Sequence, residues 1–202
     1  MMKINLIQEP FGHLIVENFF SDEEYHDVWQ EMQYISKRMR PPNETHAAMS
    51  DGLYRKRGVG VFLHDFLIDQ ADSSIFRATR KIFMAYHDAV AGDFYLSGMY
   101  RYWCNFDTIL TQMYVNGDYY KPHWDSPVLT HITLMHKTPK QYTGGDFVFP
   151  QFNYIVPLEN NQSILFPAFI MHEVTQVKTN SEEIEDGRFT ISNFLKYVPP
   201  TK

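Results

Sequence analysis

Two side chains suited to binding a metal ion lie two positions apart near the middle of the chain. His123 and Asp125 belong to the segment YVNGDYYKPHWDSP, which runs over residues 114–127. Alternate residues of a β-strand project from the same face, so an imidazole and a carboxylate at this spacing can reach one metal ion. The spacing is short enough to arise by chance, so a polar pair at a strand end is an equally good interpretation of these residues alone.

A third candidate ligand, His172, lies in the apolar segment SILFPAFIMH, where a single histidine is more often a core residue. A strand, a turn containing Pro167 and a new strand that starts near His172 would bring it to the same ion as His123 and Asp125. Two histidines and one carboxylate are the ligands of non-haem Fe(II) oxygenases, which leave coordination positions open. The zinc-protease motif H-E-x-x-H is absent, because Gln176 occupies the position of its second histidine.

An arginine, Arg188, opens the strand-like segment RFTISNF. Burying it requires an anionic partner, because an unpaired buried charge is costly. A dicarboxylate cosubstrate could be that partner, through a bidentate pair with the guanidinium; the alternative is an exposed arginine on an edge strand. Alternation predicts one face with Arg188, Thr190, Ser192 and Phe194, and the other with Phe189, Ile191, Asn193 and Leu195.

Together these motifs resemble the 2-oxoglutarate/Fe(II)-dependent dioxygenases. YVNGDYYKPHWD resembles the Y-x-x-G-x-x-Y-x-x-H-x-D core of the prolyl 4-hydroxylase branch. TPKQYTGGDFVF resembles the Y-x-G-G-E-L segment of the same branch, with Asp146 and Phe147 in place of Glu and Leu. The similarity covers residues 112–197, and it implies a double-stranded β-helix, or jelly-roll, fold.

The resemblance also implies roles for individual residues. Fe(II) would be bound by His123, Asp125 and His172. Arg188 would pair with the distal carboxylate of 2-oxoglutarate. Tyr114, the first tyrosine of the motif, and Thr190 would add hydroxyl contacts to this cosubstrate.

As an activity, the resemblance implies hydroxylation of a C–H bond. Dioxygen and 2-oxoglutarate would be cosubstrates, succinate and carbon dioxide would be released, and ascorbate would be an accessory reductant. The expected substrate is a prolyl residue of a peptide or protein. Two alternatives remain: the same chemistry on a small molecule or an alkylated nucleic acid, and a non-catalytic, cupin-like binding module.

The net charge and the cysteine content indicate which classes of binding partner and which cellular compartment to expect. A net charge of -6 argues against nucleic acid, which a basic surface would bind. The basic segment RKRG, residues 55–58, is interpreted as a solvated loop or as a local phosphate or substrate contact. The single cysteine, Cys104, allows no intramolecular disulfide and predicts a reducing, cytoplasmic location. No membrane span is expected, because no segment contains the roughly 18 apolar residues that one needs.

The elements that must position these residues suggest one domain, residues 1–202, of mainly β (α+β) class. Residues 1–93 are expected to supply helical support and loops, with the N-terminal helices packed outside the sheet. Residues 94–198 are expected to form the double-stranded β-helix core, because short β-prone runs alternate there with turn signals. The first of these runs is FYLSGMYRYW, residues 94–103.

Two helices and one long loop are expected before that core. Ser21 and Glu24 form a capping-box pattern that begins a helix, which should end before the prolines at 41 and 42. Residues 73–92 show helical spacing of apolar side chains, and residues 40–60 are expected to be a loop.

The segment THITLMH places His131, Thr133 and Met135 on one face of an expected strand. His131 either lines the cosubstrate pocket or is a satisfied core histidine. Met135 stands where some prolyl hydroxylases place a tyrosine that contacts the cosubstrate.

Overall fold

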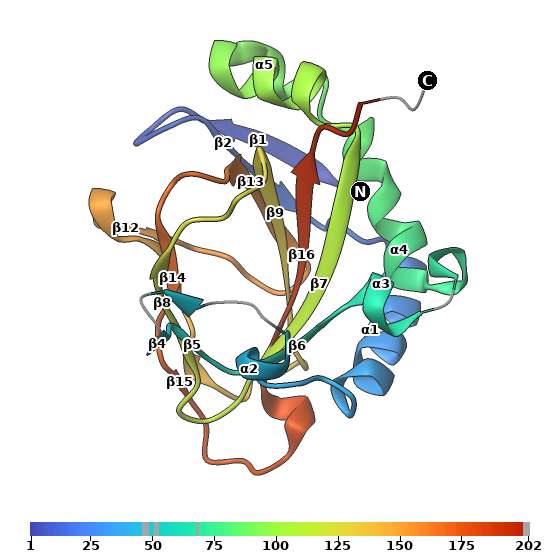
Figure 1. Ribbon diagram of the computed structural model, residues 1–202, viewed down its shortest axis with the longest axis vertical. Helices are drawn as coiled ribbons and strands as arrows, with labels where there is room; N and C mark the ends of the chain where they lie inside the picture. The colour runs from blue at the N-terminus through green and yellow to red at the C-terminus, as the bar shows by residue number, and fades with distance from the viewer. Residues whose placement is uncertain (46–48, 51–52, 68, 200–202) are drawn as a thin grey trace.

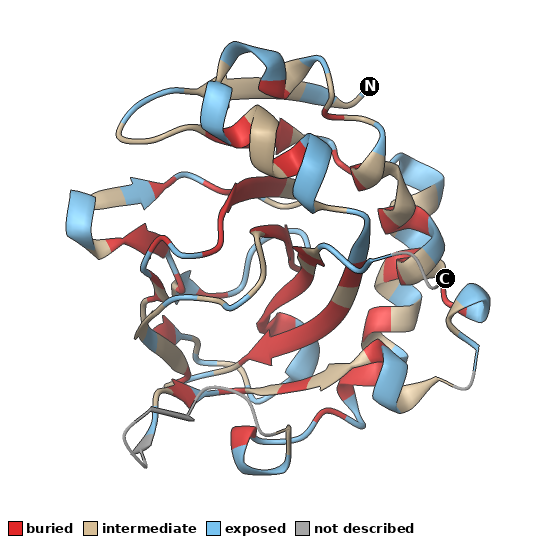
Figure 2. Ribbon diagram, turned by 45° about the horizontal axis from the view of Figure 1, so that its top comes forward, coloured by how far each residue is buried: buried red, intermediate tan, exposed pale blue. Residues whose placement is uncertain are grey.

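A computed structural model describes residues 1–45, 49–50, 53–67 and 69–199 of the protein. Two antiparallel β-sheets face each other, and helices cover the outer face of the larger sheet (Figure 1). The central strands of the larger sheet are mostly buried, whereas the helices expose their outer faces (Figure 2).

The larger sheet has seven strands in the spatial order β1-β2-β13-β9-β16-β7-β6. Strand β16 lies between β7 and β9 and pairs with β7 along its whole length. The strands of this sheet are β1 (Lys3–Ile7), β2 (His13–Glu17), β13 (Gln162–Pro167), β9 (Leu129–Met135), β16 (Arg188–Lys196), β7 (Phe106–Tyr114) and β6 (Val59–Phe62).

The smaller sheet has five strands in the order β12-β11-β14-β8-β5. They are β12 (Tyr154–Val156), β11 (Phe147–Phe149), β14 (His172–Val174), β8 (Tyr119–His123) and β5 (Lys56–Arg57). Two short ribbons complete the β structure: β10 (Thr143–Gly144) with β15 (Val177–Lys178), and β3 (Met49–Ser50) with β4 (Leu53–Tyr54).

The first helix, α1 (Asp22–Ser36), begins at the predicted capping box. The backbone N–H of Glu24 donates to Ser21 Oγ at 3.2 Å, and that of Ser21 donates to the Glu24 carboxylate at 2.9 Å. The remaining helices are α2 (Pro42–Thr45), α3 (Leu63–Phe66), α4 (Ser74–Thr79) and α5 (Phe94–Trp103).

Residues 94–103, expected to be the first strand of the core, form helix α5 instead. The Asp93 carboxylate caps this helix by accepting from the backbone N–H of Leu96 at 2.8 Å. Leu96 and Tyr100, four positions apart, are its buried residues. The prediction is wrong because the aromatic composition favours a strand, whereas the buried positions follow helical spacing.

The second expected helix, residues 73–92, is broken into α4 and two 3₁₀ turns, Arg80–Phe83 and Ala89–Gly92. Thr79, at the end of α4, is one cause of the break. Its hydroxyl donates to the carbonyl of Ile75 at 2.9 Å, so a side chain competes there with the helical backbone.

The region before residue 94 also contributes strands as well as helices. β1, β2 and β6 belong to the larger sheet and β5 to the smaller one. The expected loop over residues 40–60 contains α2, β3, β4, β5 and the start of β6, and its residues 46–48 and 51–52 lie outside the described residues. The division into support (1–93) and β core (94–198) therefore does not follow the sheets.

Strand β9 separates two hydrophobic cores. Its residues Ile132 and Leu134 face the smaller sheet, whereas Met135 packs in the core under the helices. His131 shares the face of Met135, and its Nε2 lies 2.9 Å from the buried hydroxyl of Tyr86. His131 is thus a core histidine, and the interpretation that it lines the pocket is wrong.

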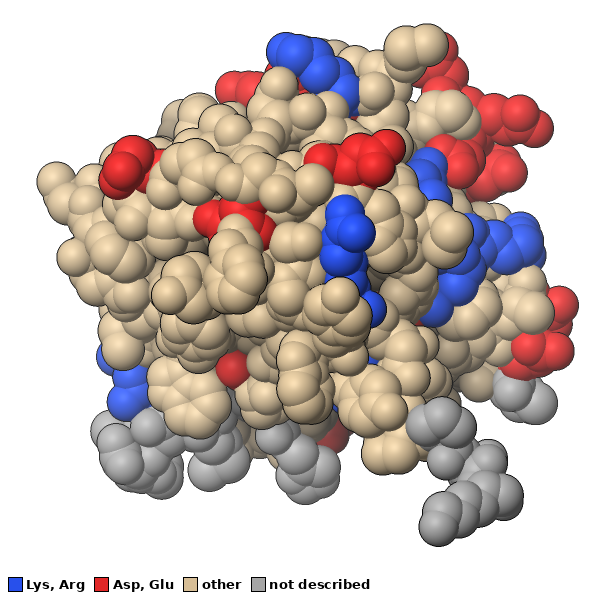
Figure 3. All heavy atoms as spheres, turned by 90° about the horizontal axis from the view of Figure 1, so that it is seen from above, with Lys and Arg blue, Asp and Glu red and all other residues tan. Residues whose placement is uncertain are grey.

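Helix α5 presents several exposed aromatic side chains, and basic and acidic residues are scattered over the face that carries this helix (Figure 3). None of the described helices is long and apolar enough to cross a membrane.

Candidate metal centre and the cavity beside it

The three candidate ligands meet at the end of the smaller sheet. His123 ends β8 and His172 begins β14, and antiparallel pairing places them directly opposite each other. Asp125 follows β8 rather than lying on it. Its backbone N–H donates to Ala168 O at 2.9 Å, and Thr130 Oγ1 donates to its Oδ2 at 2.7 Å. A fixed turn, not the expected strand alternation, therefore brings the carboxylate to the histidines.

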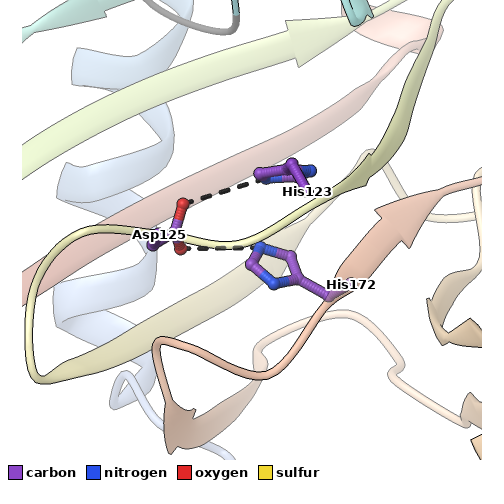
Figure 4. Close-up of side chains that lie close together, drawn as sticks. All are labelled: His123, Asp125 and His172. Atoms are coloured by element: carbon purple, nitrogen blue, oxygen red, sulfur yellow. Dashed lines mark ion pairs between the residues drawn. The ribbon is translucent and has the colours of Figure 1, made fainter. Parts of the chain in front are cut away.

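The distances between the ligand atoms suit a single ion. Asp125 Oδ1 lies 3.8 Å from His123 Nε2, and Asp125 Oδ2 lies 3.5 Å from His172 Nε2 (Figure 4). One donor atom from each residue lies within 4.8 Å of the other two. Atoms that bind one ion at about 2 Å must be roughly 3–4 Å apart, so only a small contraction is needed.

Both imidazoles are oriented by main-chain carbonyls. His123 Nδ1 lies 2.9 Å from Lys121 O, and His172 Nδ1 lies 3.0 Å from Ile170 O. A proton on Nδ1 leaves the lone pair of Nε2 free to bind a metal, with the other ring nitrogen held as is usual for histidine ligands. The hydrogen bond that Thr130 Oγ1 donates likewise fixes the orientation of the Asp125 carboxylate.

Burial sets the protonation of the three residues. Burial, aided by the nearby His172, lowers the pKa of His123 to about 2. Burial also lowers the pKa of His172, against the opposing effect of Asp125. Both imidazoles are therefore neutral, which is the metal-binding form. Burial raises the pKa of Asp125, so its anionic form needs a nearby cation.

Aromatic rings hold the histidines in place. Tyr120 stacks on His123 with ring centroids 3.5 Å apart, and Phe166 packs edge-on against His172 at 4.9 Å. Tyr120 also lines the cavity described next.

A cavity of about 650 Å³ lies between the two sheets, with the three ligands in its wall. Strand β16 lines it with alternate residues, as the sequence predicts, and β7 lies beside that strand. From these two strands the lining residues are Arg188, Thr190, Ser192, Phe194, Lys196, Thr108, Leu110, Gln112 and Tyr114.

Arg188 is a buried cation without an acidic partner. Its side chain is fully buried, with the residue 1% exposed, and within the described part of the chain it forms no ion pair. Its Nε and Nη1 have no hydrogen-bond partner, and its guanidinium lies 5.5 Å from the Tyr114 ring. Burial lowers the pKa of Arg188, and Tyr142 is the first of the groups that oppose this shift. An anion entering the cavity would satisfy these donors.

Tyr114 and Thr190, the other two predicted cosubstrate residues, also line the cavity. Both hydroxyls donate to Gln112 Oε1, Tyr114 at 3.0 Å and Thr190 at 3.3 Å. Burial raises the pKa of Tyr114, so its hydroxyl keeps its proton. Sequence reasoning missed Gln112; its alternation with Tyr114 along β7 was the available signal.

Lys56 is the second residue that the sequence interpretation missed. It lines the cavity, it is only 6% exposed, and its Nζ lies 5.4 Å and 5.7 Å from the ring centroids of Tyr114 and Tyr120. Burial lowers the pKa of Lys56 to about 7. The interpretation of RKRG as a solvated loop is therefore wrong for Lys56, although Arg57 is exposed and pairs with Asp118.

Comparisons with known proteins identify the fold. No protein-family model and no curated protein matches the sequence. A viral collagen prolyl hydroxylase from Paramecium bursaria Chlorella virus-1, solved with 2-oxoglutarate, aligns with a TM-score of 0.58 over 92% of this chain and 96% of its own, at 12% identity. A Pseudomonas putida prolyl-4-hydroxylase aligns with a TM-score of 0.59 over 93% of both chains, at 11% identity.

A third solved structure is named for a different activity. SnoN, a non-haem, α-ketoglutarate-dependent epimerase from nogalamycin biosynthesis, aligns with a TM-score of 0.54 over 90% of this chain and 76% of its own, at 14% identity. Together these similarities confirm the predicted double-stranded β-helix fold with helices outside the sheet. Fold alone does not select a reaction or a substrate.

Proposed function

We propose that the protein is a 2-oxoglutarate- and Fe(II)-dependent dioxygenase that hydroxylates a C–H bond. The observation that carries this proposal is the pairing of two incomplete sites in one cavity. His123, Asp125 and His172 could hold one metal ion and pair with no Lys or Arg among the described residues, and Arg188 lines the same cavity with unsatisfied donors. A divalent metal and a dicarboxylate would complete both sites.

The residues fit these cofactors chemically. Two neutral imidazoles and one carboxylate suit Fe(II), and they leave coordination positions for 2-oxoglutarate and dioxygen. When bound, the iron would supply the redox chemistry that reduces dioxygen and oxidises 2-oxoglutarate and the substrate. Arg188 would bind the distal carboxylate, and Tyr114 and Thr190 would add hydroxyl contacts in exchange for those to Gln112. The aromatic walls would exclude water from the reacting groups.

We propose a prolyl residue of a peptide or protein as the substrate. The motif resemblance supports this choice, and two of the structural neighbours are named prolyl hydroxylases. A small molecule or an alkylated nucleic acid is the alternative, because the structural neighbours also include SnoN, named as an epimerase, and OsALKBH1. The comparisons do not support the preference against nucleic acid, which rests on the net charge alone. The cytoplasmic location and the single domain over residues 1–202 remain predictions from the sequence.

Cosubstrate binding tests the proposal without any knowledge of the substrate. Isothermal titration of 2-oxoglutarate into the Mn(II)-loaded protein without oxygen should show metal-dependent binding. Arg188→Ala should abolish that binding, whereas Arg38→Ala, at an exposed residue just after α1, should not change it. Unchanged 2-oxoglutarate affinity in Arg188→Ala would refute the cosubstrate site, and a cupin-like binding module would then be the better hypothesis.

A further inference from the structure

We infer that the substrate carries a carboxylate that binds Lys56, and that Lys56 selects for it. This inference rests on the proposed function and specifies the class of its substrate. Lys56 lies on β5, at the edge of the smaller sheet and next to the strand that ends in His123. It lines the cavity from the smaller sheet, whereas Arg188 lines it from β16 of the larger sheet, and the two cations lie 5.4 Å and 5.5 Å from the Tyr114 ring.

Among the described residues, no carboxylate pairs with Lys56. The charge of Asp118 raises the pKa of Lys56, but the two side chains form no ion pair within the described residues. The Asp118 carboxylate is already held by Arg57 Nε at 3.2 Å and by the backbone N–H of Val115 at 2.9 Å. The Lys56 ammonium instead faces the rings of Tyr114 and Tyr120. Two aromatic faces attract a cation, but only weakly compared with a carboxylate.

Charge balance indicates that this cation is not needed for the cosubstrate. The positive charges of a divalent metal and of Arg188 are cancelled by Asp125 and by the two carboxylates of 2-oxoglutarate. Lys56 would remain as a buried, uncompensated charge in the loaded site. Asp125 is the one acidic residue among the described residues that line the cavity, so we infer that a ligand supplies the missing anion.

The other cations of the cavity wall have partners or solvent. Arg55 donates to Pro122 O at 2.9 Å, and Lys196 is partly exposed and lies over the Phe106 ring. A single ammonium matches a monoanionic carboxylate, whereas a phosphate monoester would bring excess negative charge into a buried site. The lowered pKa of Lys56, with burial as its main cause, agrees with a site that lacks its counter-ion.

A matched pair of small probes tests this inference. Phenylacetate and its neutral amide, phenylacetamide, are titrated into the protein with Mn(II) and saturating 2-oxoglutarate under nitrogen, so that Arg188 is occupied. Binding is followed by ligand-observed NMR. We expect the acid to bind at least about tenfold tighter than the amide, the usual advantage of a hydrogen bond to a charged group.

Variants assign the preference to Lys56. Lys56→Met should remove the difference between acid and amide and leave 2-oxoglutarate affinity unchanged, and Lys56→Arg should retain the difference. Lys178→Met, at an exposed lysine on β15, is the control and should behave as wild type. Equal binding of acid and amide to wild type, or an unchanged preference in Lys56→Met, overturns the inference. A loss of 2-oxoglutarate affinity in Lys56→Met also overturns it, because Lys56 would then serve the cosubstrate.

The test separates the inference from the proposed function. If 2-oxoglutarate does not bind, the proposed function fails. Arg188 could then bind the carboxylate of the probe itself, so the acid and the amide are compared in Arg188→Met. Two further probe pairs distinguish the origin of the carboxylate: N-acetylproline with its amide, and an acetylated prolyl-glutamate amide with its glutamine counterpart. Selection within the first pair indicates a small acid, and selection within the second indicates an acidic peptide.

Discussion

His123 and His172 lie directly opposite each other on the paired strands β8 and β14, and each directs its Nε2 toward a different oxygen of Asp125. The pairing register of two short strands thus sets the separation of the two imidazoles. The turn after β8 then places the carboxylate between them. We therefore expect the metal affinity of this site to depend also on residues outside the three candidate ligands.

Loss of any ligand should reduce metal binding sharply. Asp125→Ala and His172→Ala are expected to lower Mn(II) affinity by more than the roughly 10- to 100-fold that is typical for removal of an outer hydrogen bond. Isothermal titration with Mn(II) measures this loss. His26→Ala, an exposed histidine on α1, should bind as wild type does. Wild-type affinity in either ligand variant would show that these residues do not form a metal site.

The hydrogen bond from Thr130 to Asp125 should contribute to metal affinity but little to the stability of the fold. Thr130→Val removes the hydroxyl at nearly constant volume, and we expect Mn(II) affinity to fall about 10- to 100-fold. Thr133→Val is the matched control, because Thr133 lies on the same strand, is equally buried, and bonds to Ser163 instead of a ligand. Equal effects of the two substitutions on metal affinity would contradict the orienting role.

Arg188 should reduce stability in the absence of ligand. Replacing it with methionine removes a buried cation that has no ion-pair partner among the described residues. We therefore expect the free energy of unfolding of the metal-free protein to rise by about 1–4 kcal/mol, and its melting temperature to rise with it. Arg80→Met should do the opposite, because Arg80 pairs with Asp107 at 2.6 Å. Thermal denaturation of both variants checks this, and a destabilised Arg188→Met would contradict an unpaired Arg188.

Lys56 should give stability a distinct pH dependence. Its folded pKa is about 7, below its usual 10.5, so between these values the unfolded chain binds a proton that the folded chain does not. Stability should therefore rise with pH above about 7, by at most about 1.4 kcal/mol per pH unit from this group. Urea denaturation from pH 7 to 9.5 measures the slope. Lys56→Met should flatten the dependence of stability on pH. The charge of Asp118 raises the Lys56 pKa and so makes this dependence smaller than burial alone would.

The sequence predicts the local part of the site well. The alternation of β16 was confirmed, because its period of two depends only on neighbouring residues. The sequence could not show which face of β9 meets the cavity, since that depends on the opposing sheet, and His131 lies on the other side. Lys56 was missed for the same reason. Its partners on β8 lie more than sixty residues away, and no local pattern in RKRG indicates them.

Dioxygen-dependent formation of succinate tests the central proposal most directly. The protein is incubated with Fe(II), 2-oxoglutarate and ascorbate, with and without oxygen, and succinate is quantified by mass spectrometry. We predict slow succinate release that requires oxygen, increases with a substrate, and disappears in Asp125→Ala. Absence of succinate from wild-type protein that binds both Fe(II) and 2-oxoglutarate, or equal release by Asp125→Ala, would contradict the dioxygenase assignment.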